Sequence, residues 1–486
     1  MSKAELVLIP TPGTGHLISA VEFAKLIIKH DQRISILVII FHIPIHSTTT
    51  KVNTYIESQS LAVDPQRITF LTLPSLPDSD IPDPASSNFF NNMVQLQKPL
   101  VKQAIMDRLI KPVAFVFDLM CVNLVDIAKE FQLPCYVYFT AGASLLNLMF
   151  HFQALFDDHG IDISTAYSNL SDNVGLGLDL PGFRNRVPAK VLPSSLFDKD
   201  SGFAMFFNHL SRKFRETDGI LVNTFMELEP GIIQCLQEQD KIPEVYPVGP
   251  ILALHDDNNG GDREPVMRWL DEQPDSSVVF LCFGSMGSFD EDQVREIANG
   301  LDRSGQRFLW ALRRPISESS YVLPSENETF EDALPPGFLD RTAHRGKIIG
   351  WAPQVQVLAH RAVGGFVSHC GWNSILEAIW FGVPIATWPM YSEQQINAFE
   401  MVKEVQVAVE IRMDYQRNLM NKDANFMVTS SEVENGVKKL MSMDDAMRGR
   451  ISKMKNISRE VLECDGSSYT SFTCFISKVL QSVGDQ

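Results

Sequence analysis

Residues 364–389, "GGFVSHCGWNSILEAIWFGVPIATWP", place a strand, a polar turn and a helix in one short segment. The apolar run "GGFVS" leads into His369 and Cys370, and a helical pattern then ends at Gly382 and Pro384. A buried strand that runs directly into a helix and then into another apolar run is typical of a parallel sheet. The polar turn is suited to a metal site, a thiol nucleophile or a cradle for an anionic ligand.

The same alternation of short apolar runs and helical patterns extends along the 486-residue chain. One series contains "ELVLIP", "RISILVIIF", "VAFVFD" and "CYVYF", and a second contains "SVVFLCFGS", "RFLWAL" and "PIATWP". Unbroken apolar strands predict an α/β fold with two doubly wound, Rossmann-like domains facing across a cleft. We expect a first domain over residues 1–245, a linker over 246–262, a second domain over 263–464, and a C-terminal helix over 465–486 that packs back on the first domain.

The composition excludes several classes of protein. Forty-two Lys and Arg against 59 Asp and Glu give a net charge of −17, which argues against nucleic-acid binding. The apolar run at the amino terminus is too short for a signal peptide, and "ISILVIIF" has the length of a strand, so we expect a cytoplasmic protein without a membrane span. The seven cysteines include no Cys-x-x-Cys pair, which argues against a zinc knuckle or a disulfide framework.

The residues of the polar turn favour the anion cradle over the other two alternatives. Cys370 and His369 have no further metal ligands nearby in the sequence, and Cys370 has no partner pattern for a catalytic thiol. Ser374 and Glu377 have the spacing of a capping box, which predicts a helix amino terminus here. These residues could simply cap the helix. Alternatively, its free amides could bind a diphosphate, with His369, Asn373 and Ser374 as additional donors.

Two residues near the amino terminus are candidates for acid–base chemistry. His16 follows the strand and Pro/Gly turn of "LIPTPGTGHL", so it should face the cleft, where an imidazole is suited to act as a general base. Asp118 ends the strand "VAFVFD" at the same edge of the sheet. Asp118 could cap the next helix, or it could hold the imidazole in one tautomer and stabilise its protonated form.

Residues 351–394, "WAPQVQVLAHRAVGGFVSHCGWNSILEAIWFGVPIATWPMYSEQ", resemble the sugar-nucleotide box of plant family-1 UDP-dependent glycosyltransferases. The order of elements from His16 to "GFLDRTAHRGKIIGWAPQ" and the closing "GSSYTSF" is similar to that family over essentially the whole chain. The resemblance implies the GT-B fold, in which the first domain binds the acceptor and the second binds the UDP-sugar. It also implies that His16 is the catalytic base and Asp118 is its partner.

The resemblance further implies which residues hold the donor. Trp351 stacks on uracil, the backbone of Ala352 pairs with the base edge, and Gln354 and Glu377 bind the ribose hydroxyls. The implied diphosphate ligands are His369, Asn373, Ser374, Tyr391 and Ser285. The implied sugar contacts are Trp372, Glu393, Gln394 and Thr140. A Gln at the last position of the box is associated with glucose in that family, so Gln394 points to UDP-glucose.

Two aromatic segments, "SSNFFNNMVQ" and "FAMFFNHL", are either ordinary core or the lining of an apolar acceptor pocket. In the second case Phe89, Phe206 and Phe207 are the candidates for contact with the acceptor. The turns "PGTGH" and "FGSMGS" lack the Gly-x-Gly-x-x-Gly pattern with its acidic partner, so NAD is not expected.

Taken together, the residues and the resemblance predict an inverting, metal-independent transfer of glucose from UDP-glucose to a hydroxyl of a small apolar acceptor. A phenolic acceptor such as a flavonoid or phenylpropanoid fits an imidazole base, and the product is a β-O-glucoside. The alternatives are a terpenoid or hormone acceptor, a different UDP-sugar, or a non-catalytic binding protein. We expect a monomer that needs no cofactor or metal besides the UDP-glucose substrate.

Overall fold

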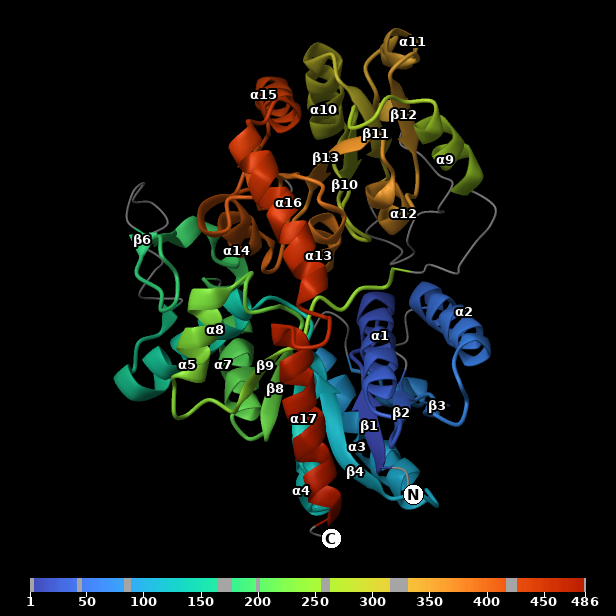
Figure 1. The fold of residues 1–486 in the computed structure, drawn as a ribbon, viewed down its shortest axis with the longest axis vertical. Helices are drawn as coiled ribbons and strands as arrows, with labels where there is room; N and C mark the ends of the chain where they lie inside the picture. Colours follow the sequence, from blue (N-terminus) through green and yellow to red (C-terminus); the bar gives the residue numbers. More distant parts are fainter. Residues whose placement is uncertain are drawn as a thin grey trace.

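The protein is described by a computed structural model over residues 4–41, 46–82, 89–163, 177–197, 202–254, 263–314, 331–416 and 426–484. The chain forms two α/β halves, each built around one sheet (Figure 1). The strand order is β3-β2-β1-β4-β5-β8-β9 in the first sheet and β12-β11-β10-β13-β14-β15 in the second. Within both sheets every described pair of neighbouring strands is parallel.

The first sheet has strands whose side chains alternate between two apolar layers. In β1, Leu6 and Leu8 pack into one cluster while Val7 and Ile9 pack into another, because successive side chains point to opposite faces. Burial on both faces explains the unbroken apolar runs. The strands are β1 (Ala4–Ile9), β2 (Ile34–Ile40), β3 (Ile68–Thr72), β4 (Pro112–Asp118), β5 (Cys135–Phe139), β8 (Gly219–Val222) and β9 (Val245–Pro247), with a separate antiparallel hairpin of β6 (Gly177–Leu178) and β7 (Val187–Pro188).

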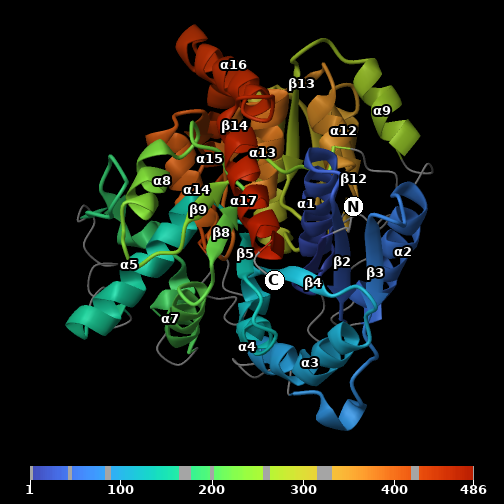
Figure 2. The same cartoon turned by 60° about the horizontal axis from the view of Figure 1, so that its bottom comes forward.

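Helices cover both faces of the first sheet. The layer on one face includes α1 and the C-terminal α17, and the layer on the other includes α3 and α4 (Figure 2). The helices of this half are α1 (Thr14–His30), α2 (His46–Ala62), α3 (Phe89–Met106), α4 (Val125–Glu130), α5 (Ala143–His159), α7 (Phe203–Phe214) and α8 (Pro230–Gln237), with a 3-10 segment η2 (Leu119–Leu124).

The second half repeats this architecture with one large core. Its strands are β10 (Val278–Cys282), β11 (Arg307–Ala311), β12 (Gly346–Ile349), β13 (Val363–Ser368), β14 (Ile385–Thr387) and β15 (Ala408–Glu410). Its helices are α9 (Arg263–Asp271), α10 (Glu291–Ser304), α11 (Phe338–Thr342), α12 (Gln354–Ala359), α13 (Trp372–Phe381), α14 (Gln394–Phe399), the π-helical turn η6 (Glu400–Glu404), α15 (Ser430–Met441) and α16 (Asp445–Glu460).

The chain crosses between the halves twice. The predicted linker begins inside β9, since Tyr246 and Pro247 still belong to the first sheet, and its residues 255–262 lie outside the described ranges. After α16 the chain returns as α17 (Ser467–Gly484), whose Phe472 and Phe475 pack with Phe23 in the core of the first half. The last helix therefore lies along the first sheet although it follows the second in the sequence (Figure 1).

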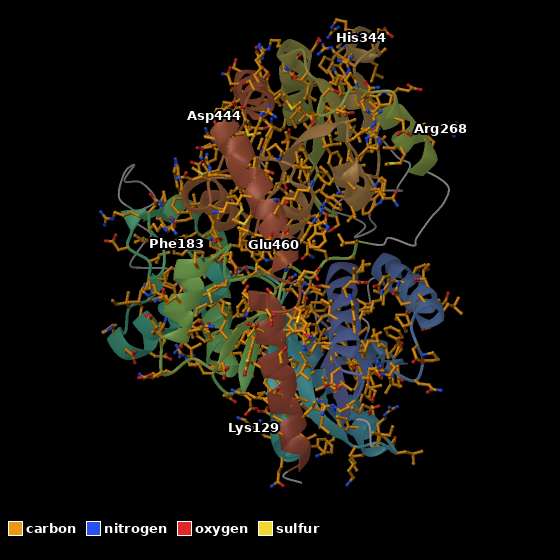
Figure 3. All side chains as sticks on the ribbon, in the orientation of Figure 1. Lys129, Phe183, Arg268, His344, Asp444 and Glu460 are labelled. Carbon is orange, nitrogen blue, oxygen red and sulfur yellow. The ribbon has the colours of Figure 1, made fainter. Side chains whose placement is uncertain are left out.

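The two halves are in direct contact. The ring of Phe183 lies 6.4 Å from that of Phe399, and Figure 3 labels Phe183 in the first half close to the second. The carboxylate of Glu404 accepts hydrogen bonds from the backbone amides of Arg184 and Asn185, at 3.1 and 2.9 Å. These contacts join the 183–185 segment of the first half to α14 and η6 of the second.

Candidate active site

His16 and Asp118 come together because their strands are neighbours in the first sheet. β1 pairs with β4 so that Ile9 lies beside Phe117. Asp118 is the last residue of β4, and His16 lies in the first turn of α1, just beyond the end of β1 at the same edge of the sheet. His16 Nδ1 lies 3.0 Å from an oxygen of Asp118, whose side chain is fully buried, whereas the His16 side chain keeps 36% of its surface exposed. The Thr11 hydroxyl donates to the other Asp118 oxygen, which fixes the carboxylate.

The electrostatics of this pair suit a proton acceptor. Burial lowers the pKa of His16, but the charge of Asp118, the hydrogen bond to it and the charge of Glu393 outweigh burial, so the pKa is raised above 6.5. A carboxylate only accepts hydrogen bonds, so Nδ1 carries the proton in the neutral ring. The Thr140 hydroxyl also lies near Nδ1, at 3.4 Å. The second ring nitrogen, Nε2, is thereby left as the basic atom.

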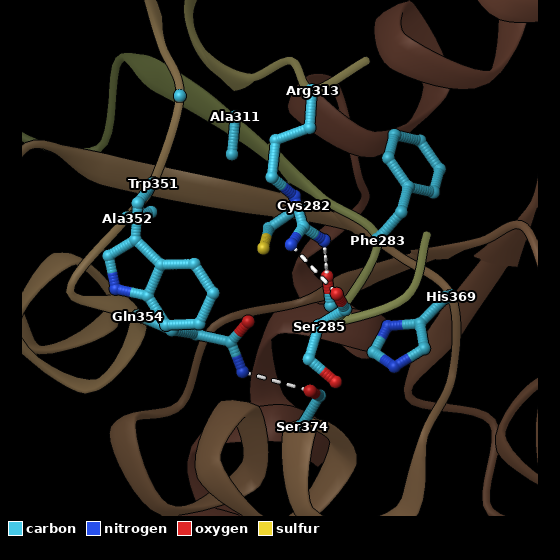
Figure 4. A pocket seen from close by; sticks show the side chains of 12 residues that line it. Cys282, Phe283, Ser285, Ala311, Arg313, Trp351, Ala352, Gln354, His369 and Ser374 are labelled. Carbon is cyan, nitrogen blue, oxygen red and sulfur yellow. Dashed lines mark hydrogen bonds between the residues drawn. The ribbon is translucent and has the colours of Figure 1, made fainter. Parts of the chain in front are cut away.

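A cavity of about 250 Å³ opens in the second half, at the carboxyl-terminal ends of its strands (Figure 4). Loops that follow β10, β11, β12 and β13 contribute to it, which matches the usual position of ligands in open parallel sheets. The residues that line it are Cys282, Phe283, Gly284, Ser285, Ala311, Arg313, Gly350, Trp351, Ala352, Gln354, His369 and Ser374. Six of the predicted UDP ligands, Ser285, Trp351, Ala352, Gln354, His369 and Ser374, are therefore gathered around one space.

The predicted capping box is wrong. Helix α13 begins at Trp372, its N-cap is Gly371 in extended conformation, and no side chain caps it. Ser374 lies inside the first turn, where its hydroxyl accepts a hydrogen bond from Gln354 Nε2 at 2.8 Å. Gln354 also donates to Glu377 over 2.7 Å. The polar side chains that sequence spacing assigned to helix capping therefore form a network between α12 and α13.

Glu377 is the electrostatically unusual member of this network. Burial raises its pKa to about 7, although the hydrogen bond from Gln354 opposes the shift. Near neutral pH its carboxyl group is thus divided between the acid and the carboxylate. A ligand that donates hydrogen bonds to it would favour the carboxylate.

His369 is held neutral in a tight slot. A methyl group at Gly284 or Gly371 would lie 2.5 or 2.6 Å from His369 Nε2, so both glycines are required for the ring to fit. Burial and the charge of Arg313 lower the pKa of His369 to about 4. Its buried Nδ1 has no hydrogen-bond partner in the described part of the chain. The ring is therefore a neutral polar group beside the cavity.

Sequence reasoning missed Arg313, which lines the same cavity. Its guanidinium donates to the carbonyl oxygens of Gly284, Ser285 and Gly287, the latter two at 2.8 and 3.3 Å. It also lies 5.7 Å from the ring centre of Trp351. The available signal was a basic residue just beyond the strand "RFLWA", at the edge where an anion was already expected.

The predicted sugar contacts lie at the domain interface. Trp372 is buried, with its indole N–H 2.7 Å from the carbonyl oxygen of Asn223 in the first half. The side-chain oxygen of Gln394 accepts from the backbone amides of Met390 and Tyr391, at 2.9 and 3.1 Å, which leaves its NH₂ group for other partners. Glu393, at the start of α14, is close enough to raise the pKa of His16, and burial raises its own pKa.

The remaining predicted residues are less closely grouped. Asn373 is exposed on the first turn of α13, and neither Asn373 nor Tyr391 lines the described cavity. Phe207 is 5% exposed and packs in the core with Leu210 and Phe214, which favours a structural role for it. Phe89 and Phe206 are only half-buried.

Two further observations concern the described residues only. No group of three or more His, Cys, Asp or Glu side chains in those ranges is arranged to hold a metal ion. None of their helices is both long enough and apolar enough to cross a bilayer.

Comparison with known proteins agrees with this fold. The family described as "UDP-glucoronosyl and UDP-glucosyl transferase" matches residues 238–455. A Fragaria ananassa protein named UDP-glucose flavonoid 3-O-glucosyltransferase 6 is 46% identical, over 99% of this chain and 100% of its own. A Siraitia grosvenorii transferase solved with UDP superposes with a TM-score of 0.86 at 42% identity, covering 98% of this chain and 100% of its own. A Medicago truncatula glycosyltransferase solved with UDP-glucose superposes with a TM-score of 0.84 at 39% identity, covering 98% of each chain.

Two facing Rossmann-like domains with a cavity at the carboxyl edge of the second sheet, together with the superposed structures, define a glycosyltransferase of the GT-B fold. The chain belongs to the plant family-1 UDP-glycosyltransferases.

Proposed function

We propose that this enzyme transfers glucose from UDP-glucose to a hydroxyl of a small apolar acceptor, most readily a phenol, and that it does so with inversion and without a metal ion. The observation that carries the proposal is the His16–Asp118 pair, which supplies a base at the domain interface while the nucleotide cavity lies in the facing half. The name of the Fragaria relative and the UDP-glucose in the Medicago structure support this donor and a flavonoid-like acceptor.

The base chemistry follows from the tautomer of His16. Its Nε2 takes the proton of the acceptor hydroxyl while the acceptor oxygen forms a bond to the anomeric carbon. The bond from that carbon to the diphosphate breaks, and UDP leaves with the electron pair. Attack from the face opposite UDP converts an α-linked donor into a β-glucoside. Asp118, fixed on Nδ1, stabilises the imidazolium that results.

The donor half supplies binding and charge stabilisation. Trp351, 43% exposed at the rim of the cavity, offers a flat surface to uracil, with the backbone of Ala352 beside the base. Gln354 and Glu377 receive the ribose hydroxyls. The diphosphate lies at the start of α13, where free amides favour the charge that grows on the leaving group. The remaining residues in this role are His369, Asn373, Ser374, Ser285 and Tyr391.

Glucose then lies between the two halves, within reach of Trp372, Glu393, Gln394 and Thr140. These side chains come from both domains, so the sugar site is complete only when the domains are in contact. Of the aromatic candidates for the acceptor, Phe89 and Phe206 fit better than the buried Phe207. Replacing Phe89 or Phe206 by Ala should change acceptor selectivity while UDP-glucose binding is retained.

The test is to incubate the purified protein with UDP-glucose, and separately with UDP-galactose, together with phenolic and terpenoid acceptors. Products are detected by mass, and the anomeric configuration is read from the proton coupling constant by NMR. A β-glucoside formed from UDP-glucose by the wild type and absent with His16→Ala supports the proposal. An α-glucoside, or equal product from His16→Ala, contradicts it. Tight UDP binding without any product favours a non-catalytic binding protein.

A further inference from the structure

Two buried glutamates from different domains meet at the interface, outside the site described above. Glu229 directly precedes α8 in the first half, and Glu400 begins the turn η6 in the second. Their exposed fractions are 2% and 1%. The two carboxyl groups lie close enough to each other for the charge of Glu229 to raise the pKa of Glu400. Two buried carboxylates at this separation repel each other, which favours a state in which one of the two carries a proton.

The surroundings of the two carboxyl groups differ, and they favour Glu400 as the residue that holds the proton. Glu229 accepts hydrogen bonds from the backbone amides of Ala143 and Ser144, at 2.9 and 2.7 Å, at the amino terminus of α5. Two amide donors and the positive end of a helix both favour the charged form of Glu229. Glu400 has no such support, because its Oε2 is buried without a hydrogen-bond partner among the described residues.

Other charges act in the same direction. Burial and then the charge of Glu229 raise the pKa of Glu400 far above its usual range, and Glu404 on the same turn adds to the effect. Burial also raises the pKa of Glu229, and its hydrogen bonds from the α5 amides oppose that shift. The other neighbouring side chain at Glu400 is the neutral hydroxyl of Ser144. The pair therefore retains one proton well above the pH at which an exposed glutamate loses it.

The helix that Glu229 anchors leads back to the catalytic base. The turn before α5 contains Thr140, whose hydroxyl lies 3.4 Å from His16 Nδ1. The same turn contains Gly142, where an added methyl group would lie 2.9 Å from the ring of Trp372. Glu229 thus holds one end of a short segment that touches both the base and the first residue of α13.

We propose that Glu229 and Glu400 share one proton, resident on Glu400, and that this acid pair joins the two domains and positions the 140–144 segment beside His16. Glu229 and Glu400 are positioning residues in this scheme, since neither touches the reacting atoms. The acid pair would position the 140–144 segment whatever acceptor the enzyme uses. Only the kinetic measurement described below rests on the proposed function.

The test compares Glu400→Gln with Glu229→Gln, with the exposed Glu410→Gln as the matched control. A glutamine is neutral and can donate, so it reproduces the protonated Glu400 but not the charged Glu229. We expect Glu400→Gln to match or exceed the wild type in Tm. We expect Glu229→Gln to lower the Tm by roughly 3–10 °C, because its NH₂ group replaces an acceptor that faces backbone N–H groups.

The pH dependence gives a second, independent readout. A carboxyl group whose pKa is raised in the folded state makes the protein less stable as the pH rises. The loss begins near the pKa of the unfolded state, about 4.3, and continues until the pH passes the pKa of the folded state. Glutamine cannot ionise, so the Tm difference between Glu400→Gln and the wild type should grow from pH 6 to pH 9. The Glu410→Gln difference should stay constant over the same range.

The outcomes separate cleanly. Equal loss of Tm in Glu400→Gln and Glu229→Gln, or a Tm difference for Glu400→Gln that does not change with pH, would overturn the shared proton. At saturating UDP-glucose, Glu229→Gln should lower kcat at least 10-fold with little change in the KM for UDP-glucose; an unchanged kcat would overturn the positioning role. If the wild type transfers no glucose, the proposed function fails while the unfolding comparison still decides this proposal.

Discussion

The indole N–H of Trp372 donates to the carbonyl oxygen of Asn223 across the domain interface, at 2.7 Å. Trp372 is the first residue of α13, and Asn223 directly follows β8, so this bond ties the second half of the chain to the first. The ring also packs against Gly142, next to the segment that carries Thr140. One side chain therefore links the start of the proposed diphosphate helix with the neighbourhood of His16, the proposed base.

Replacing Trp372 by Phe keeps an aromatic ring but removes the N–H. The buried carbonyl oxygen of Asn223 is then left without this donor, which costs about 1–3 kcal/mol. We expect a lower free energy of unfolding in urea and a larger fall in kcat than in UDP affinity. Trp380, half-buried at the far end of α13, provides the control: Trp380→Phe should leave kcat unchanged. A Trp372→Phe enzyme with wild-type stability would contradict the bridging role.

Replacing Asp118 by Asn should slow the reaction and shift its pH profile. Asp118 raises the pKa of His16, and His16 works in its deprotonated form, so wild-type kcat/KM should fall on the acid side with an apparent pKa above 6.5. Without the carboxylate this pKa falls and the acid limb moves to lower pH. Activity at neutral pH should drop on the order of 10²–10⁴-fold because the imidazolium loses its partner. If the acid side of the kcat/KM profile does not shift in Asp118→Asn, the group that titrates there is not His16.

Binding of UDP should release a proton from Glu377. The pKa of this residue is about 7 in the empty site, and ribose hydroxyls that donate to its carboxylate favour the ionised form. UDP affinity should then rise between pH 6 and pH 8. Calorimetry in two buffers of different ionisation enthalpy measures the release directly. Glu377→Gln should abolish the proton release, whereas Glu410→Gln should release a proton as the wild type does. Proton release that persists in Glu377→Gln would show that the proton does not come from Glu377.

Arg313 should matter for the nucleotide and not for the acceptor. Replacing it by Met removes the hydrogen bonds to the loop carbonyls of Gly284, Ser285 and Gly287 that shape one wall of the cavity. We expect the KM for UDP-glucose to rise roughly 10–100-fold, equivalent to about 1.4–2.7 kcal/mol, with the acceptor KM unchanged. The neighbouring Arg314→Met serves as control, because Arg314 pairs with the exposed Asp332 instead. Equal rises for both substrates would indicate general unfolding.

Metal independence is tested by chelation. The proposed stabilisation of the leaving diphosphate comes from the amides at the start of α13 and the polar groups beside them, so EDTA should leave the rate unchanged. The control is a metal-dependent glycosyltransferase assayed in the same buffer. Activity that disappears with EDTA and returns with Mn²⁺ would contradict this mechanism.

The amino-acid sequence by itself determined the class of fold, and it also brought His16 and Asp118 to one edge of the first sheet. Strands such as "ELVLI" and "ISILVII" are buried on both faces, and burial on both faces requires a nearly unbroken run of apolar residues in the sequence. His16 and Asp118 could be placed at one edge because each follows such a run. Most of the proposed donor residues came from the resemblance of one contiguous box, which contains five of the twelve residues that line the cavity.

Tertiary structure decided the contacts between distant segments. Arg313 reaches the 284–287 loop because β11 lies beside β10, and Glu229 meets Glu400 because the two domains pack together. The start of α13 at Trp372 rather than Ser374 was also settled there, since Ser374 and Glu377 bond to Gln354 of another helix instead of capping their own. The spacing of residues in the sequence reflects the period of a helix or strand. It does not reveal which hydrogen-bond partner a polar side chain will have, because partners from distant segments come within reach only in the folded protein.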